Sequence, residues 1–364
     1  MQTTEIKVPH GQSGATRLSP WWQLWREHRT FLLLIALHVL AGVVADWTGY
    51  ADVIRPNTWR LDLFSHFLRI ILGGVVYVFL WHRLKVQREA ENHLRLWEGW
   101  GTVVSSFRSS SLTIPGLGGA FIVAVGVATS TAIHDGWKGV IGGYDWDHRL
   151  VVWDRALHGG MDPWRLLQPL LGVPEVTFAL DALYWWWYAL LMGGVIWMAW
   201  CTDRKLRERL LVAYVLTWVL LGTVTAHLTA SVGPCFLRAH LGGPTSFDPL
   251  MAYLREVDRI RPLVALQLQD ALWAAHRSGH RDYWMSISAM PSLHVAIPAL
   301  FAIGGWKVSR KVGVALGVYA ALTIVASVHL GWHYAVDGYV GAFGAAVAWW
   351  IAGRILGDSQ RPQE

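Results

Sequence analysis

Long apolar runs recur along most of the chain, and polar positions are concentrated in the segments between them. Several runs reach about 18 to 22 residues, enough for an α-helix to cross a hydrocarbon core of about 30 Å. The pattern therefore predicts an all-α fold, a polytopic membrane helical bundle of about eight spans. The predicted spans are residues 31–46, 62–81, 113–134, 178–200, 210–232, 290–306, 312–330 and 338–355.

Composition agrees with a membrane protein and argues against two other classes. Hydrophobic residues make up 54% of the 364 positions, charged residues only 15%, and there are 24 tryptophans. The net charge is +6, but the basic residues do not form one patch with interleaved aromatics, so we expect no nucleic-acid partner. Cys201 and Cys235 fall at opposite ends of a predicted span, which disfavours a mutual disulfide and a cysteine-rich metal site.

The basic residues predict an orientation. The N-terminus and the segments 81–95, 201–210 and 306–311 are dense in Lys and Arg and fall on one side of the predicted bundle. The positive-inside rule makes that side cytoplasmic, which leaves the longer loops 135–177 and 233–289 outside. We thus divide the chain into three parts. These are 1–110, an N-terminal cytoplasmic tail with two spans and an amphipathic cytoplasmic segment; 111–356, a catalytic membrane domain; and 357–364, a cytoplasmic tail.

Ionisable residues at membrane depth are costly and mark candidate functional positions. His294 stands at the start of an apolar run, behind Pro291 and Ser292. Proline suits the first position of a helix, which places Ser292 and His294 in the first turn. Free backbone N–H groups and the helix dipole make that turn favourable for an anion such as phosphate.

A second polar group follows at the junction of the last two predicted spans. His333 and Asp337 are four residues apart, so on a helix the carboxylate can hold one imidazole nitrogen and leave the other basic. His294 begins the sixth predicted span and His333 ends the seventh, so both face the same compartment. We expect them to meet as an activated nucleophile with a separate acid.

These residues together resemble the signature of the type 2 phosphatidic acid phosphatase superfamily of membrane enzymes. The combination is Pro291-Ser292-x-His294 followed, about forty residues on, by His333-Tyr334-x-x-Asp337. The resemblance implies a six-helix phosphatase-like core toward the C-terminus and a phosphohistidine intermediate. It implies that His333 attacks phosphorus, Asp337 orients it, His294 protonates the leaving group and Ser292 helps to cradle the phosphate.

Two departures from the family pattern concern cations. The Ser-Arg pair usual before the nucleophilic histidine is Ala326-Ser327 here, and Leu254 stands where a lysine usually precedes the Arg261-Pro262 pair. This pattern looks like the inositolphosphotransferase-like branch that includes inositol phosphorylceramide and sphingomyelin synthases, to which residues 157–188 add a weaker likeness. We expect replacement cations from the outer loops, with Arg261 and Arg281 as the phosphate-binding candidates among Arg238, Arg255, Arg259, Arg261, Arg277 and Arg281.

Two other readings stay open at this point. His329, His333 and Asp337 repeat at i, i+4 and i+8, and with His294 they could hold a metal in a His/Asp-dependent membrane enzyme. Alternatively, buried histidines and an aspartate could relay protons in a proton-coupled lipid or anion transporter. A CDP-alcohol phosphotransferase is disfavoured, because Asp337-Gly338 is not followed by the Ala-Arg of that family.

The sequence thus predicts a membrane-embedded lipid phosphotransferase or lipid phosphatase in a bacterial cytoplasmic membrane, with its site on the non-cytoplasmic side. The expected donor is a phospholipid or another lipid-linked phosphate, and the acceptor is a lipid hydroxyl or water. Because fixed hydrogen-bond donors and a helix start can stabilise the developing charge, the prediction includes no metal and no other cofactor.

Overall fold

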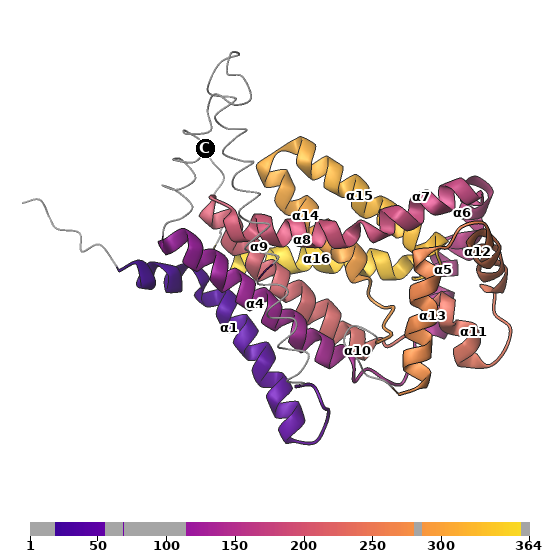
Figure 1. Cartoon of the computed structure of the whole chain (residues 1–364), viewed down its shortest axis with the longest axis horizontal. Coiled ribbons are helices and arrows are strands. Elements are labelled where there is room, and N and C mark those ends of the chain that lie inside the picture. Colours follow the sequence, from indigo (N-terminus) through magenta and orange to yellow (C-terminus); the bar gives the residue numbers. More distant parts are fainter. Residues whose placement is uncertain (1–18, 55–67, 69–113, 280–285, 358–364) are drawn as a thin grey trace, which may run out of the picture.

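The computed structural model describes residues 19–54, 68, 114–279 and 286–357, and in these ranges the chain is helical with no β-strand (Figure 1). This confirms the all-α prediction. The helices in chain order are α1 (Pro20–Trp47), α4 (Ile114–Lys138), α5 (Asp147–Leu157), α6 (Pro163–Leu171), α7 (Pro174–Trp185), α8 (Trp187–Trp200), α9 (Arg204–Thr217), the π-helix η1 (Trp218–Thr225), α10 (Ala226–Leu228), α11 (Pro234–Leu241), α12 (Asp248–Ile260), α13 (Val264–Arg277), α14 (Leu293–Val308), α15 (Arg310–His329) and α16 (Ala335–Ile355).

Six continuous helical stretches of the described chain are long and apolar enough to cross a bilayer, which fits an integral membrane protein. They are Trp21–Trp47, Leu117–Lys138, Pro174–Trp200, Arg204–Leu228, Arg310–His329 and Ala335–Ile355, with the shorter apolar helix Leu293–Val308 beside them. Each predicted span falls on one of these helices except 62–81, which lies outside the described residues. The first helix begins earlier than predicted, because Ser19 caps it and accepts a hydrogen bond from the Trp22 N–H at 3.3 Å.

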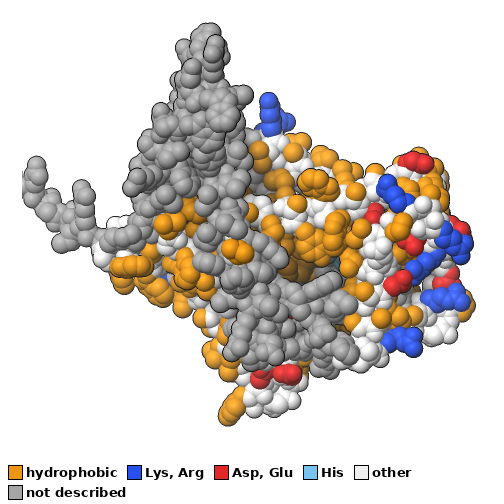
Figure 2. Space-filling view, in the orientation of Figure 1, with side chains coloured by type: hydrophobic (Ala, Val, Ile, Leu, Met, Phe, Trp, Pro, Cys, Tyr) orange, Lys and Arg blue, Asp and Glu red, His pale blue; other side chains and the backbone are white. Residues whose placement is uncertain are grey.

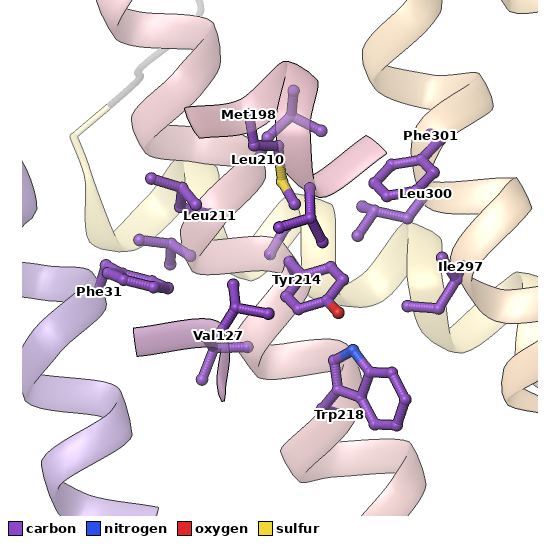
Figure 3. Packing of buried hydrophobic residues seen from close by; sticks show 14 of the residues in the cluster. Phe31, Val127, Met198, Leu210, Leu211, Tyr214, Trp218, Ile297, Leu300 and Phe301 are labelled. Atoms are coloured by element: carbon purple, nitrogen blue, oxygen red, sulfur yellow. The ribbon is translucent and has the colours of Figure 1, made fainter. Parts of the chain in front are cut away.

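The bundle core is an apolar cluster in which α9 is packed among α1, α4, α8, α14 and α16. Figure 3 shows Tyr214 of α9 at its centre, with Phe31 and Phe301 on either side. Glycines let the helices approach closely, as is common between membrane helices. A Cβ on Gly304 would lie 2.6 Å from a methyl of Leu210.

The site-end cluster is a second apolar core, formed by α5, α6, α7, α11, α12 and α13 with the facing ends of α15 and α16. These short helices gather at the right-hand end of Figure 1, and charged side chains are concentrated over that end in Figure 2. In the described part of the predicted outer loops 135–177 and 233–289, the chain forms α5, α6 and α11 to α13. These helices were not predicted, because their apolar residues alternate with polar ones and each helix is too short to span a membrane.

Aspartates from distant elements support several helix starts at this end. Each of three buried aspartates accepts hydrogen bonds from two consecutive backbone N–H groups at the start of another helix. The pairs are Asp147 with Val232 and Gly233 before α11, Asp181 with Val264 and Ala265 in α13, and Asp154 with Ala335 and Val336 in α16. We call these three residues the capping aspartates. They satisfy donors that a helix start leaves free, and their charge suits the positive end of the helix dipole.

Candidate active site

His333 lies in the tight turn between α15 and α16. The turn passes through Gly331, whose φ of 73° is a left-handed conformation that glycine adopts without strain. The N–H groups of Trp332 and His333 both donate to the Ser327 carbonyl, at 2.9 and 3.3 Å. This fixes the backbone on which the histidine stands.

Asp337, in the first turn of α16, orients His333. One carboxylate oxygen lies 3.2 Å from Nδ1 of His333 and also accepts the backbone N–H of Tyr334 at 3.0 Å. Both side chains are buried, so the pair is shielded from bulk solvent. With Nδ1 engaged, Nε2 is the ring nitrogen left for reaction, and His333 lines a cavity.

His294 faces the same cavity from the first turn of α14. Its ring is sandwiched by aromatics, stacked on Tyr184 with centroids 4.7 Å apart and tilted against Trp187 at 4.3 Å. The His294 and His333 ring centroids are 6.4 Å apart. The structure thus brings together the two histidines that are about forty residues apart in sequence, leaving a gap in which a tetrahedral group can be held between them.

Ser292 lies immediately behind the cavity. It is fully buried, and its hydroxyl has no hydrogen-bond partner among the described residues. Its backbone N–H donates to the Asp337 carbonyl at 3.1 Å. Its neighbours Pro291 and Leu293 line the cavity, whereas Ser292 itself does not. The predicted phosphate contact of Ser292 stays a prediction.

Two of the capping aspartates hold this turn in place. Asp154 accepts two N–H groups of α16, directly after the His333 turn. Asp147 accepts the Tyr334 hydroxyl at 2.8 Å in addition to its two backbone donors. Burial raises the pKa of Asp154 to about 6, and burial followed by the charge of Asp147 raises the pKa of Tyr334, so its hydroxyl stays a donor. Sequence reasoning missed both aspartates, although their seven-residue spacing puts them on one face of α5.

The cavity has a volume of about 780 Å³ and is mostly aromatic and aliphatic in its lining. Its size and lining suit a lipid or a similarly large amphiphile. The aromatic lining residues are Tyr184, Trp185, Trp187, Tyr188, Trp218, Phe236 and Trp332. Polar side chains of α4 line it as well, including Lys138.

The predicted arginines are placed differently. The Arg261 guanidinium lies over the Phe178 ring, 3.9 Å from its centroid, and does not line the cavity. Arg281 lies outside the described residues. Among the other candidates, Arg238 pairs with Asp248 and Arg255 pairs with Asp270 at the protein surface. The phosphate roles of Arg261 and Arg281 stay predictions.

His329 makes a separate set of contacts. It is fully buried, with Nε2 2.9 Å from the Thr177 hydroxyl and its ring edge against Tyr253. The turn after α15 ends the helix before His333, so the three residues spaced by four do not share one helical face. Within the part of the chain that the structure describes, no three His, Cys, Asp or Glu side chains gather to hold a metal ion.

Comparison with known sequences assigns the family. The comparisons with curated proteins and with solved structures give no match. A sequence model of the PAP2 superfamily matches residues 148–351, from the first turn of α5 to the last turns of α16. This range holds His294, His333 and Asp337 and makes up more than half of the 364 residues. The chain therefore belongs to the PAP2 superfamily.

Proposed function

We propose that the protein is a lipid phosphotransferase or lipid phosphatase that works through a phosphohistidine. Its superfamily supports a membrane enzyme of phosphatase or phosphotransferase type. The observation that carries the proposal is the pair of histidine rings 6.4 Å apart, one held by Asp337 and both lining one cavity. A nucleophile with its orienting carboxylate and a separate acid is what a two-step displacement needs.

In the first step, Nε2 of His333 attacks phosphorus and an N–P bond forms. The P–O bond to the leaving group breaks, and His294 gives its proton to the departing oxygen. In the second step, His294 takes the proton of an acceptor hydroxyl, whose oxygen attacks phosphorus and breaks the N–P bond. The enzyme is regenerated, and the acceptor, water or a lipid alcohol, decides between hydrolysis and transfer.

The absence of the arginine that usually precedes the nucleophilic histidine favours transfer from a lipid phosphodiester. A diester carries one negative charge and a monoester up to two, so a diester needs fewer cations for binding in a low-dielectric site. The large apolar cavity also suits a second lipid as acceptor. Both points support our proposal that the protein acts like the inositolphosphotransferase-like branch.

Helix direction supports a site on the non-cytoplasmic side. His294 stands in the first turn of α14, whereas Lys307, Arg310 and Lys311 lie at the other end of that helix and in the turn that follows. The positive-inside rule assigns the basic turn to the cytoplasm, which puts His294 on the opposite side.

The test uses the purified full-length protein in lipid nanodiscs with labelled phosphatidic acid or labelled phosphodiester lipids, with and without diacylglycerol or ceramide. We expect a new phospholipid in the presence of an acceptor, and acid-labile label on the protein. We expect His333→Ala to lose both the new phospholipid and the label on the protein. The control is His148→Ala, which removes an exposed histidine of α5 and should keep both signals.

Two results would count against this function. Acid-labile label retained by His333→Ala would exclude it as the nucleophile. Release of inorganic phosphate as the only product, whatever the acceptor, would exclude the transferase and leave a phosphatase.

A further inference from the structure

Helix α4 reaches the cavity from outside the family-matched region. It ends at Lys138, ten residues before the match begins at residue 148. His134, Asp135 and Lys138 on its last turns line the same cavity as His294 and His333. Part of the site is thus built by a segment that the superfamily pattern does not include.

His134 fixes the position of this helix end. Its ring lies edge-on to Trp218 with centroids 4.8 Å apart, and a Cβ on Gly222 would be 2.6 Å from its Cε1. Both neighbours belong to η1, so the close packing of an imidazole on a glycine sets α4 against the π-helix. Lys138, one turn further on, is held at the cavity by this contact.

Lys138 is the one Lys or Arg among the described residues that line the cavity. It is close enough to His294 for its charge to act on that ring, and Asp135 is close enough to act on Lys138. Among the arginine candidates of the outer helices, Arg238 and Arg255 pair with Asp248 and Asp270, and Arg261 lies over Phe178. Among the described residues that line the cavity, the positive charge near His294 therefore comes from α4.

A cation has a clear use at this place. Phosphoryl transfer is catalysed mainly by positioning and by neutralising charge on the non-bridging oxygens. A lysine ammonium is a compact charge on a flexible stem, and it binds phosphate as a point charge. In a mostly apolar cavity its attraction for an anion is much stronger than in water.

We propose that Lys138 binds the non-bridging oxygens of the substrate phosphate, taking the place of the arginine and lysine that the motifs lack. This deepens the function proposed above and rests on it. In this proposal α4 contributes a phosphate-binding residue to the site. The Asp135 carboxylate, one turn before, favours the charged form of Lys138.

The test measures binding of radiolabelled orthophosphate to the full-length protein in detergent, and separately KM and kcat for the labelled lipid. The variants are Lys138→Gln, Lys138→Arg and the control Lys307→Gln, which removes an exposed lysine at the far end of α14. We expect Lys138→Gln to weaken orthophosphate binding by at least about tenfold and to raise KM more than it lowers kcat. Lys138→Arg keeps most of the affinity, and Lys307→Gln binds like the wild type.

Unchanged orthophosphate affinity in Lys138→Gln overturns the proposal, as does a wild-type protein that binds no orthophosphate. Gel filtration and thermal unfolding show whether Lys138→Gln is folded, and recovery of binding by Lys138→Arg excludes a loss due to misfolding alone. Failure of the proposed function has a different signature, because orthophosphate binding would then still depend on Lys138 while no lipid turns over and no label reaches His333.

Discussion

The bundle core and the site-end cluster are held together by different forces. In the bundle core, apolar side chains and glycines of α1, α4, α8, α14 and α16 pack around α9. In the site-end cluster, an apolar core of similar type is crossed by aspartates that accept backbone N–H groups of other helices. Apolar packing is non-directional and holds the helices together without fixing individual atoms. The hydrogen bonds of the aspartates are directional and fix the positions of particular backbone N–H groups. His333 and Asp337 stand at the helix start that Asp154 caps.

The largest effect is expected from Asp337→Asn. The asparagine amide is uncharged and its NH₂ group can only donate, so the ring loses its fixed tautomer and the stabilisation of its charged form. We expect turnover of labelled lipid to fall by about 10²- to 10⁴-fold, with the protein still folded.

The matched control for Asp337→Asn is Asp46→Asn. Asp46, at the end of α1, also accepts two backbone N–H groups, those of Val53 and Ile54. An equal loss of turnover in this variant would show that activity depends on general stability and not on the His333 pair.

Next in size is Leu211→Ala in the bundle core. Leu211 is fully buried on α9 (Figure 3), and truncation of such a leucine costs about 2 to 5 kcal/mol through lost contacts and a cavity. We expect a lower unfolding midpoint in detergent, and unchanged turnover per folded molecule. A large fall in turnover of the folded fraction would contradict the division between the two regions.

Asp154→Asn tests how a capping aspartate contributes to stability, through the pH dependence of the unfolding free energy. Burial raises the pKa of Asp154 from 3.8 to about 6, so the folded protein holds this proton more tightly than the unfolded chain. Its stabilisation is fully present below pH 3.8 and is lost as the pH rises through 6, a change of up to about 3 kcal/mol. The asparagine cannot titrate, so we expect the wild-type advantage in unfolding free energy to shrink between pH 4 and pH 7.

At each pH, the unfolding free energy of Asp154→Asn is subtracted from that of the wild type. Contributions of other titrating groups are common to both proteins and cancel. An advantage that grows with pH would mean that the two N–H donors outweigh burial and lower the pKa of the carboxyl.

The smallest effect is expected from Tyr334→Phe. It removes one hydrogen bond to Asp147, which keeps the N–H donors of Val232 and Gly233. We expect a loss of about 1 to 2 kcal/mol in unfolding free energy and a fall of a few-fold in turnover, measured side by side with wild type. A loss of turnover as large as that of Asp337→Asn would assign Tyr334 a direct role in the chemistry.

Long apolar runs made the spanning helices predictable, and the spacing of His333 and Asp337 predicted their contact. The pairing of His294 with His333 followed from the direction of the spans. Asp147 and Asp154 were not recognised, because an aspartate that caps a distant helix has no local signature. Lys138 was missed for a similar reason, since only the packing of α4 on η1 brings it to the cavity. Arg261 was expected at the phosphate because of its motif, but its guanidinium rests on Phe178.

The contact between α14 and α16 has a consequence for how this enzyme can diversify. The Ser292 N–H reaches the Asp337 carbonyl, and a Cβ on Gly341 would lie 2.4 Å from the Ser292 carbonyl oxygen. Main chain meets main chain there, so the relative register of the two motif segments does not depend on the identity of nearby side chains. Mutations in the aromatic lining can then alter the shape of the cavity without disturbing that register. Any side chain at position 341 would separate the two segments, so their spacing depends on glycine at this position.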